Sequence, residues 1–133
     1  MSASEALAVP ALGHGAANVG NLFRPLSDDE SWAILEAAWD SGIRYYDTAP
    51  HYGLGLSERR LGAFLQTKPR EEYVLSTKVG RLLRPNPDHD GGLDTANDFH
   101  VPDDLQRVWD FSDDGIRAGL DLSLIHISEP TRL

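Results

Sequence analysis

The chain has 133 residues, of which 41% are apolar and 25% charged, and this composition is that of one small globular domain. It is shorter than the roughly 250 residues of a complete (β/α)8 barrel. Twelve Lys and Arg residues against 21 Asp and Glu residues give a net charge of -9. This balance argues against nucleic acid or an anionic membrane as the main partner, because both require a basic surface. The absence of cysteine excludes disulfides, thiolate nucleophiles and cysteine-based zinc sites.

The sequence also indicates the cellular compartment and the fold class. No apolar run approaches the roughly 18 to 20 residues of a membrane span. Residues 1–9 lack the basic segment followed by an apolar one that is typical of secretory signals. We therefore expect a cytoplasmic protein of the α/β class.

The first half of the chain alternates between strand and helix patterns. A short strand is predicted over 11–18. Ser27 and Glu30 form the capping-box pattern that begins a helix, and Gly42 is typical of a residue that ends one. The β-rich stretch 43–48 predicts the next strand.

Apolar spacing indicates what the first helix buries. Trp32, Leu35 and Trp39 recur at helical spacing, which predicts a core face rather than a binding stripe. A second helix is expected over 57–66 and a third strand over 73–79. Strands and helices that alternate with short connections favour a parallel sheet.

The second half of the chain changes character. The segment 81–111 is rich in proline and aspartate and lacks periodicity, so we expect a long loop there. His89 and His100 lie among its aspartates, but without a regular element to bring them together, a solvated acidic loop is favoured over a metal site. We expect no metal. Ser112 caps a third helix, predicted over 112–120.

Three residues that can carry chemistry follow the predicted strands. Asp47 ends the second strand, Tyr52 lies in the loop just after it, and Lys78 ends the third strand. The carboxyl ends of parallel strands meet at one edge, so a carboxylate, a phenol and an ammonium can converge there. A phenol donates its proton poorly near neutral pH, but a nearby ammonium favours the phenolate. Such a tyrosine can protonate a carbonyl oxygen as hydride reaches the carbon.

These residues lie in stretches that resemble a known family. Residues 42–62 (GIRYYDTAPHYGLGLSERRLG) and 76–80 (STKVG) resemble the aldo-keto reductases, in particular the branch of sugar and pyridoxal dehydrogenases, and the resemblance covers about 10–84. It implies a partial (β/α)8 TIM barrel made of about the first three βα units. It also implies an oxidoreductase that uses NADP or NAD and acts on a small carbonyl or sugar substrate.

The resemblance also implies roles for individual residues. Tyr52 matches the acid/base of the family, Lys78 its activator and Asp47 the partner of Lys78. Gly15 and Asp47 are the candidate cofactor-binding residues. The Gly-rich run around Gly15 lacks the spacing of a dinucleotide loop, and close backbone packing at the barrel mouth is favoured. His51 is a candidate substrate contact, although a solvated loop histidine is the more common case.

The end of the chain departs from the family pattern. The fourth catalytic residue of the family, a histidine after the fourth strand, has no match, and its role is not transferred to His126. Residues 122–132 (LSLIHISEPTR) resemble a translated sequencing-library adapter. We therefore expect 1–121 to be the N-terminal part of a barrel and 122–133 to be a non-native tail. The alternative to an enzyme is a truncated, catalytically inactive fragment or a small non-enzymatic module.

Overall fold

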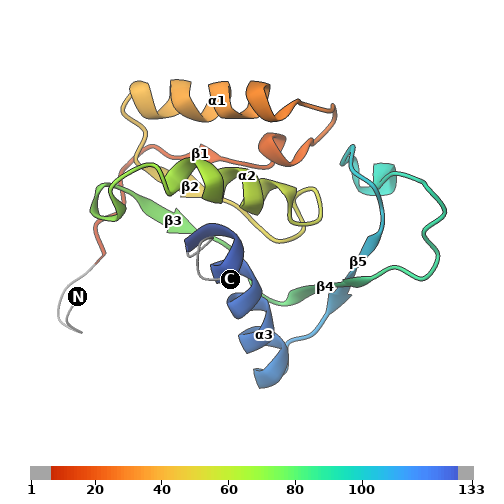
Figure 1. The fold of residues 1–133 in the computed structure, drawn as a ribbon. Helices are drawn as coiled ribbons and strands as arrows, with labels where there is room; N and C mark the ends of the chain where they lie inside the picture. The colour runs from red at the N-terminus through yellow and green to blue at the C-terminus, as the bar shows by residue number, and fades with distance from the viewer. Residues whose placement is uncertain (1–6, 129–133) are drawn as a thin grey trace.

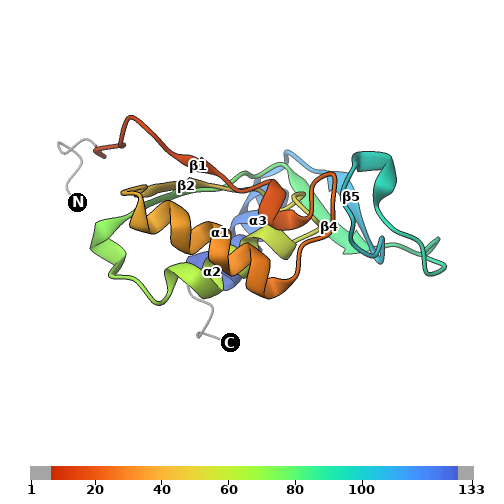
Figure 2. The same cartoon turned by 90° about the horizontal axis from the view of Figure 1, so that it is seen from above.

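A computed structural model describes residues 7–128, and its centre is a three-stranded parallel sheet covered on one face by two helices (Figures 1 and 2). The strands β1 (His14–Gly15), β2 (Tyr45–Asp47) and β3 (Val74–Ser76) pair in that order. The helices α1 (Asp28–Asp40) and α2 (Leu56–Leu65) connect them. Within the described residues this sheet does not close into a barrel. The predicted alternation of strands and helices is confirmed.

The strand β2 begins later than predicted because the residues before it close the end of α1. The amide of Ile43 donates to the carbonyl of Ala38, and the amide of Gly42 donates to that of Trp39. These bonds close the end of α1, with Gly42 at a φ of 96°. The first two residues of the predicted strand 43–48 therefore lie outside β2.

The cap of α1 is confirmed, whereas one of its predicted core residues is exposed. The Ser27 hydroxyl accepts from the Glu30 amide at 3.0 Å, and the Glu30 carboxylate accepts from the Ser27 amide at 3.1 Å. Leu35 and Trp39 are buried. Trp32 is 38% exposed, so its assignment to the core was wrong. It packs edge-on against the ring of Phe64 on α2, at the rim of the contact between the helices.

The second helix begins earlier than predicted and buries its first turn. It starts at Leu56, after Gly55 in a left-handed conformation, rather than at Ser57. The Ser57 hydroxyl is buried, donates to the Ala16 carbonyl at 2.7 Å and lies 2.8 Å from the Thr48 hydroxyl. A side chain of α2 thus joins the ends of β1 and β2.

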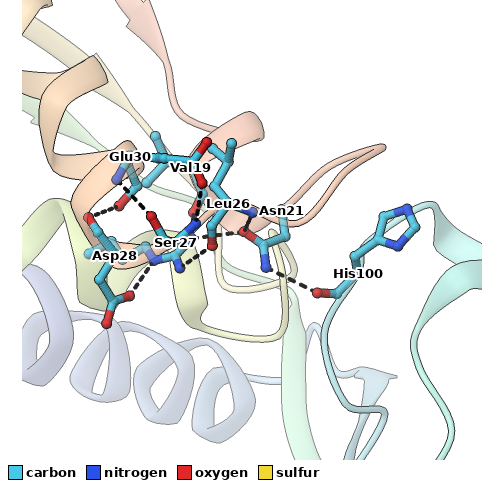
Figure 3. Close-up of polar contacts among 9 residues, drawn as sticks. Val19, Asn21, Leu26, Ser27, Asp28, Glu30 and His100 are labelled. Atoms are coloured by element: carbon cyan, nitrogen blue, oxygen red, sulfur yellow. Dashed lines mark hydrogen bonds and ion pairs between the residues drawn. The ribbon is translucent and has the colours of Figure 1, made fainter.

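A single arginine of α2 organises the connection between β1 and α1. The Arg60 guanidinium donates to the carbonyls of Val19 and Leu26, to the Asn21 side chain and to the Asp28 carboxylate. Figure 3 shows these acceptors together and also shows the Asn21 amide reaching the carbonyl of His100, a contact of 3.0 Å. This connection, with its short helix η1 (Asn18–Gly20), is therefore fixed from both sides.

The segment expected to be a long loop contains regular structure, so that expectation is corrected. The strands β4 (Arg81–Pro85) and β5 (Leu105–Trp109) form an antiparallel pair, and we refer to residues 81–109 as the ribbon. It projects away from α1 and α2 in Figure 1, whereas the later helix of residues 113–123 contacts β4. The pairing joins residues up to 28 positions apart in the chain, Arg81 and Trp109. Local periodicity does not reveal such a pairing.

The remaining elements are short helical turns and one further helix. Short helical turns η2 (Arg70–Glu72) and η3 (Thr95–Asn97) lie before β3 and between the ribbon strands. Helix α3 (Asp113–Ser123) has the predicted cap, with the Ser112 hydroxyl accepting from the Gly115 amide. The last turn, η4 (Leu124–Ser128), packs against α2. The predicted tail 122–133 thus begins within α3, its residues 129–133 lie outside the described residues, and its origin stays a prediction.

Two apolar clusters hold the fold together. The larger lies between the sheet and the helices, and the smaller joins the ribbon to the loop after β2. The larger comprises Ala16, Val19, Leu35, Trp39, Tyr46, Leu61, Phe64, Leu65 and Tyr73, and the smaller comprises Leu54, Leu83, Phe99 and Val101. The second cluster shows that the ribbon is packed onto the loop that carries Tyr52.

A close backbone approach beside Tyr52 gives a first prediction. A Cβ on Gly20 would lie 2.6 Å from the Tyr52 carbonyl oxygen, so Gly20→Ala forces these two backbones apart. We expect a loss of about 1–3 kcal/mol in the free energy of unfolding, measured by urea denaturation. Gly15→Ala is the matched control, because its Cβ would meet no atom of the chain within 4 Å. Equal stability of the two variants would contradict the packing described here.

Candidate active site

The pairing of the three strands places Asp47 at the centre of the candidate site. Its partners across the sheet are Gly15 on β1 and Ser76 on β3. All three strands run in the same direction, so these positions lie at their carboxyl ends. The edge predicted to gather the reactive side chains is the one at which they are found.

Lys78 is held at this edge by two acceptors. Its ammonium donates to the Asp47 carboxylate at 3.0 Å and to the Thr48 carbonyl at 2.8 Å. Burial alone lowers the pKa of Lys78, but the hydrogen bond and charge of Asp47 and the proximity of Tyr52 outweigh it and raise the pKa. Lys78 therefore carries a proton at neutral pH. Lys78 and Asp47 are 45% and 38% exposed, which leaves the pair open to a ligand.

A hydroxyl chain supports the other oxygen of Asp47. The Ser76 hydroxyl donates to this oxygen at 2.6 Å, and the Tyr45 hydroxyl lies 3.1 Å from that of Ser76. Sequence reasoning did not assign roles to Ser76 and Tyr45. The signal for Ser76 was its position two residues before Lys78, because alternate residues of a strand share a face.

Tyr52 lies beside Lys78 in the loop after β2. The Lys78 ammonium is 5.0 Å from the centre of the Tyr52 ring. Two backbone contacts fix this loop: Gly20 abuts the Tyr52 carbonyl, and Gly53, at a φ of 66°, abuts Gly20. The Phe99 ring of the ribbon stacks on the Tyr52 ring at 6.1 Å. The structure thus brings Asp47, Tyr52 and Lys78 together.

His51 lies against Tyr52 and lines a pocket. The two rings meet edge to face with centres 4.7 Å apart. The pocket, of about 200 Å³, is also lined by Lys78 and by residues of the ribbon. Burial, with the charges of Arg81, Arg107 and Lys78, lowers the pKa of His51 from 6.5 to about 4, against an opposing effect of Asp94. The imidazole is neutral at physiological pH.

Arg107 anchors the ribbon to this loop and was not found by sequence reasoning. Its guanidinium donates to both carboxylate oxygens of Asp94, at 3.0 and 2.7 Å, and to the His51 carbonyl at 2.8 Å. Both side chains are largely buried. No local pattern indicates this role, because Arg107 and His51 are 56 positions apart.

A buried carboxylate supports the strand end that carries Lys78. Glu58 is fully buried, and its carboxylate accepts from the Thr77 hydroxyl at 2.8 Å and from the His126 ring at 3.2 Å. The sequence analysis did not give Glu58 a role in the site. The sequence signal for a role of Glu58 was a charged residue on the face of α2 that packs against the sheet.

The backbone of Gly15 borders open space. A Cβ at this position would meet no atom of the chain within 4 Å, so open space adjoins the backbone directly across from Asp47. Gly13, by contrast, is packed against the Tyr45 ring. Among residues 7–128, no group of three or more His, Asp or Glu side chains could hold a metal ion, and no helix is long and apolar enough to cross a membrane.

Comparison with known proteins identifies the family. The sequence pattern of the Aldo/keto reductase family matches residues 11–124. The chain belongs to the aldo-keto reductase family. It is 69% identical to D-threo-aldose 1-dehydrogenase of Pseudomonas sp. over an alignment of 142 positions, which covers 98% of this chain and 43% of that protein. It is 42% identical to pyridoxal 4-dehydrogenase of Microbacterium luteolum, covering 93% of this chain and 38% of that protein.

Solved structures of the family share the fold of the chain. The glycerol dehydrogenase of Gluconobacter oxydans superposes with a TM-score of 0.63 at 26% identity, over 86% of this chain and 31% of that one. The chain thus spans less than half the length of each of these three relatives. The predicted fold class, a part of the family barrel built on parallel strands, is confirmed.

The ion pair in the ribbon gives a second prediction. Arg107→Leu leaves the Asp94 carboxylate buried without its partner, so we expect a loss of about 3–5 kcal/mol in the free energy of unfolding. Replacement of both residues by leucine should cost less than Arg107→Leu alone. Arg84→Leu, an exposed arginine of the same ribbon, is the control. If Arg107→Leu and Arg84→Leu unfold at the same urea concentration, Arg107 does not anchor the ribbon.

The lowered pKa of His51 gives a third prediction. The unfolded chain binds a proton at His51 more readily than the folded chain, so this residue makes the fold less stable as the pH falls from 6.5 to about 4. The fall in unfolding free energy over that range should be smaller in His51→Gln. In NMR spectra recorded across this pH range, the chemical shift of the His51 ring protons should change with a midpoint far below pH 6.5. A midpoint near 6.5 would contradict the burial and charge described here.

Proposed function

We propose that this chain provides the cofactor-binding residues and the proton-transfer residues of a nicotinamide-dependent oxidoreductase. The proposed enzyme acts on a small carbonyl or sugar substrate. The observation that carries the proposal is the cluster of Asp47, Lys78 and Tyr52 at one sheet edge, with the ammonium 3.0 Å from the carboxylate and 5.0 Å from the phenol ring centre. Membership of the aldo-keto reductase family supports it.

In the proposed mechanism, Tyr52 exchanges a proton with the oxygen of the substrate. During reduction its hydroxyl donates a proton to the carbonyl oxygen, and during oxidation the phenolate accepts the proton from the alcohol. The positive charge of Lys78 favours the phenolate and so makes the proton easier to release. Asp47 keeps Lys78 charged and in place, and Ser76 keeps Asp47 oriented.

The proposed cofactor is NADP or NAD, which supplies or accepts the hydride. Gly15 and Asp47 would hold it, because open space adjoins the Gly15 backbone opposite Asp47. The carboxylate of Asp47 and the ammonium of Lys78 both remain partly exposed at this edge of the sheet.

We propose an aldose as the substrate. A relative that shares 69% identity with this chain is named D-threo-aldose 1-dehydrogenase. The neutral imidazole of His51 lines the pocket and contacts the Tyr52 ring. It can donate a hydrogen bond to a hydroxyl group of such a substrate or accept one from it.

Replacement of the phenol tests the role of Tyr52. The experiment uses the 133-residue chain and a hybrid barrel, in which residues 1–121 replace the matching part of the Pseudomonas sp. relative. In the hybrid barrel, Tyr52→Phe should lower kcat by roughly 100-fold or more, because the proton donor is lost. The dissociation constants of NAD and NADP, measured by fluorescence, should change by less than about twofold, since the ring is retained.

The matched control is Tyr73→Phe, which removes a hydroxyl just before β3, at the opposite end of this strand from Lys78. It should retain most of the activity. Near-normal turnover in Tyr52→Phe would overturn the role of Tyr52. The 133-residue chain, assayed in parallel, tests the alternative of an inactive fragment: turnover by it would exclude that alternative.

A further inference from the structure

The pocket beside Lys78 has one wall that the proposed proton-transfer residues do not use. The wall comes from the ribbon and consists of Arg81 and Trp109, which pair directly across β4 and β5. Directly paired residues of antiparallel strands project to the same face, so both side chains border the same space. The same space is also lined by His51 and Lys78.

The planar guanidinium group of Arg81 packs over an aromatic ring. Its guanidinium carbon lies 4.0 Å above the Trp109 ring. The other neighbour of Trp109 is Phe111, whose ring stacks on it at 5.5 Å, and Phe111 in turn packs onto Gly80. The Phe111 ring and the Arg81 guanidinium thus both pack on the ring of Trp109. Stacking uses only the face of this group and leaves its N–H donors free at the edge.

Those donors have no partner among the described residues. Within residues 7–128, the Arg81 side chain makes no hydrogen bond or ion pair. The guanidinium groups of Arg60 and Arg107, by contrast, are both paired with carboxylates. The charge of Lys78, its neighbour in the pocket, is matched by Asp47. Arg81 is thus a cation beside the proposed reaction site. Its N–H donors can bind acceptor oxygens of a ligand in the pocket.

We propose that Arg81, held by Trp109, binds the hydroxyl oxygens of a polyhydroxylated carbonyl substrate at carbons beyond the reacting one. This inference rests on the proposed function and names the residue that selects hydroxylated substrates. A guanidinium edge matches two neighbouring oxygens, as in a vicinal diol. His51, neutral beside it, adds one further donor or acceptor.

A carboxylate on the substrate would present similar oxygens, and the experiment separates the two. The hybrid barrel is assayed for reduction of three four-carbon aldehydes: D-threose, with hydroxyl groups; succinic semialdehyde, with a carboxylate; and butanal, with neither. The variant Arg81→Leu removes the donors, and Arg84→Leu on the same strand is the control, because Arg84 is exposed and does not line the pocket.

We expect Arg81→Leu to lower kcat/KM for D-threose by roughly 10- to 100-fold, mainly through KM, and to leave butanal within about twofold. Arg84→Leu should change neither value. Equal effects of Arg81→Leu on D-threose and butanal would overturn the proposal, and so would no effect on either. A loss confined to succinic semialdehyde would show that the subsite takes carboxylates instead and would also overturn it.

A binding measurement separates this inference from the proposed function. In the 133-residue chain, addition of D-threose should shift the NMR signal of the Trp109 indole N–H, and Arg81→Leu should abolish the shift. A wild-type hybrid barrel that reduces none of the three aldehydes would contradict the proposed function, whereas this shift would still support the subsite. Absence of the shift in the wild-type chain would count against the subsite even if the enzyme were active.

Discussion

The position of Asp47 in the sheet is the constraint on which the candidate site depends. Because β2 lies between β1 and β3, its last residue has a neighbour on each side, Gly15 and Ser76. One neighbour has no side chain and leaves space for a ligand, and the other supplies a hydroxyl. A slip of one residue in the pairing of β2 with β3 would turn Asp47 away from Lys78, since adjacent residues of a strand face opposite sides. The buried contacts of Ser57 with Ala16 and Thr48 fix the pairing of β2 with β1.

The loop with Tyr52 is held by parts of the chain that are distant in sequence. Gly20 supports it from the connection before α1, while Phe99 and Arg107 support it from the ribbon. The ribbon in turn is joined to that same connection through Asn21 and His100. These three segments therefore pack together around Tyr52 and His51, which holds the loop in the position that the proposed proton transfer requires.

The sequence was most informative where function and local structure share short motifs. The capping box of Ser27, the parallel order of the strands and the gathering of Asp47, Tyr52 and Lys78 all follow from residues that lie close together or end neighbouring strands. The prediction of a long loop over 81–111 was wrong because the pairing of Arg81 with Trp109 is decided by tertiary contacts. For the same reason Arg107 could not be recognised, since its acceptor is a backbone carbonyl in a remote loop. Trp32 illustrates the opposite error: its helical spacing is that of a core residue, yet its position at the rim leaves it exposed.

The contacts of Arg60 have a consequence for the rate at which the chain folds. The carbonyl and amide groups that this side chain joins lie 34 to 41 positions before it, and they come from a connection with little regular structure of its own. That connection gains these hydrogen-bond partners only where α2 is packed beside it, because the guanidinium is carried by α2. Contacts between segments this far apart in the sequence slow folding, since a long loop must close before they form.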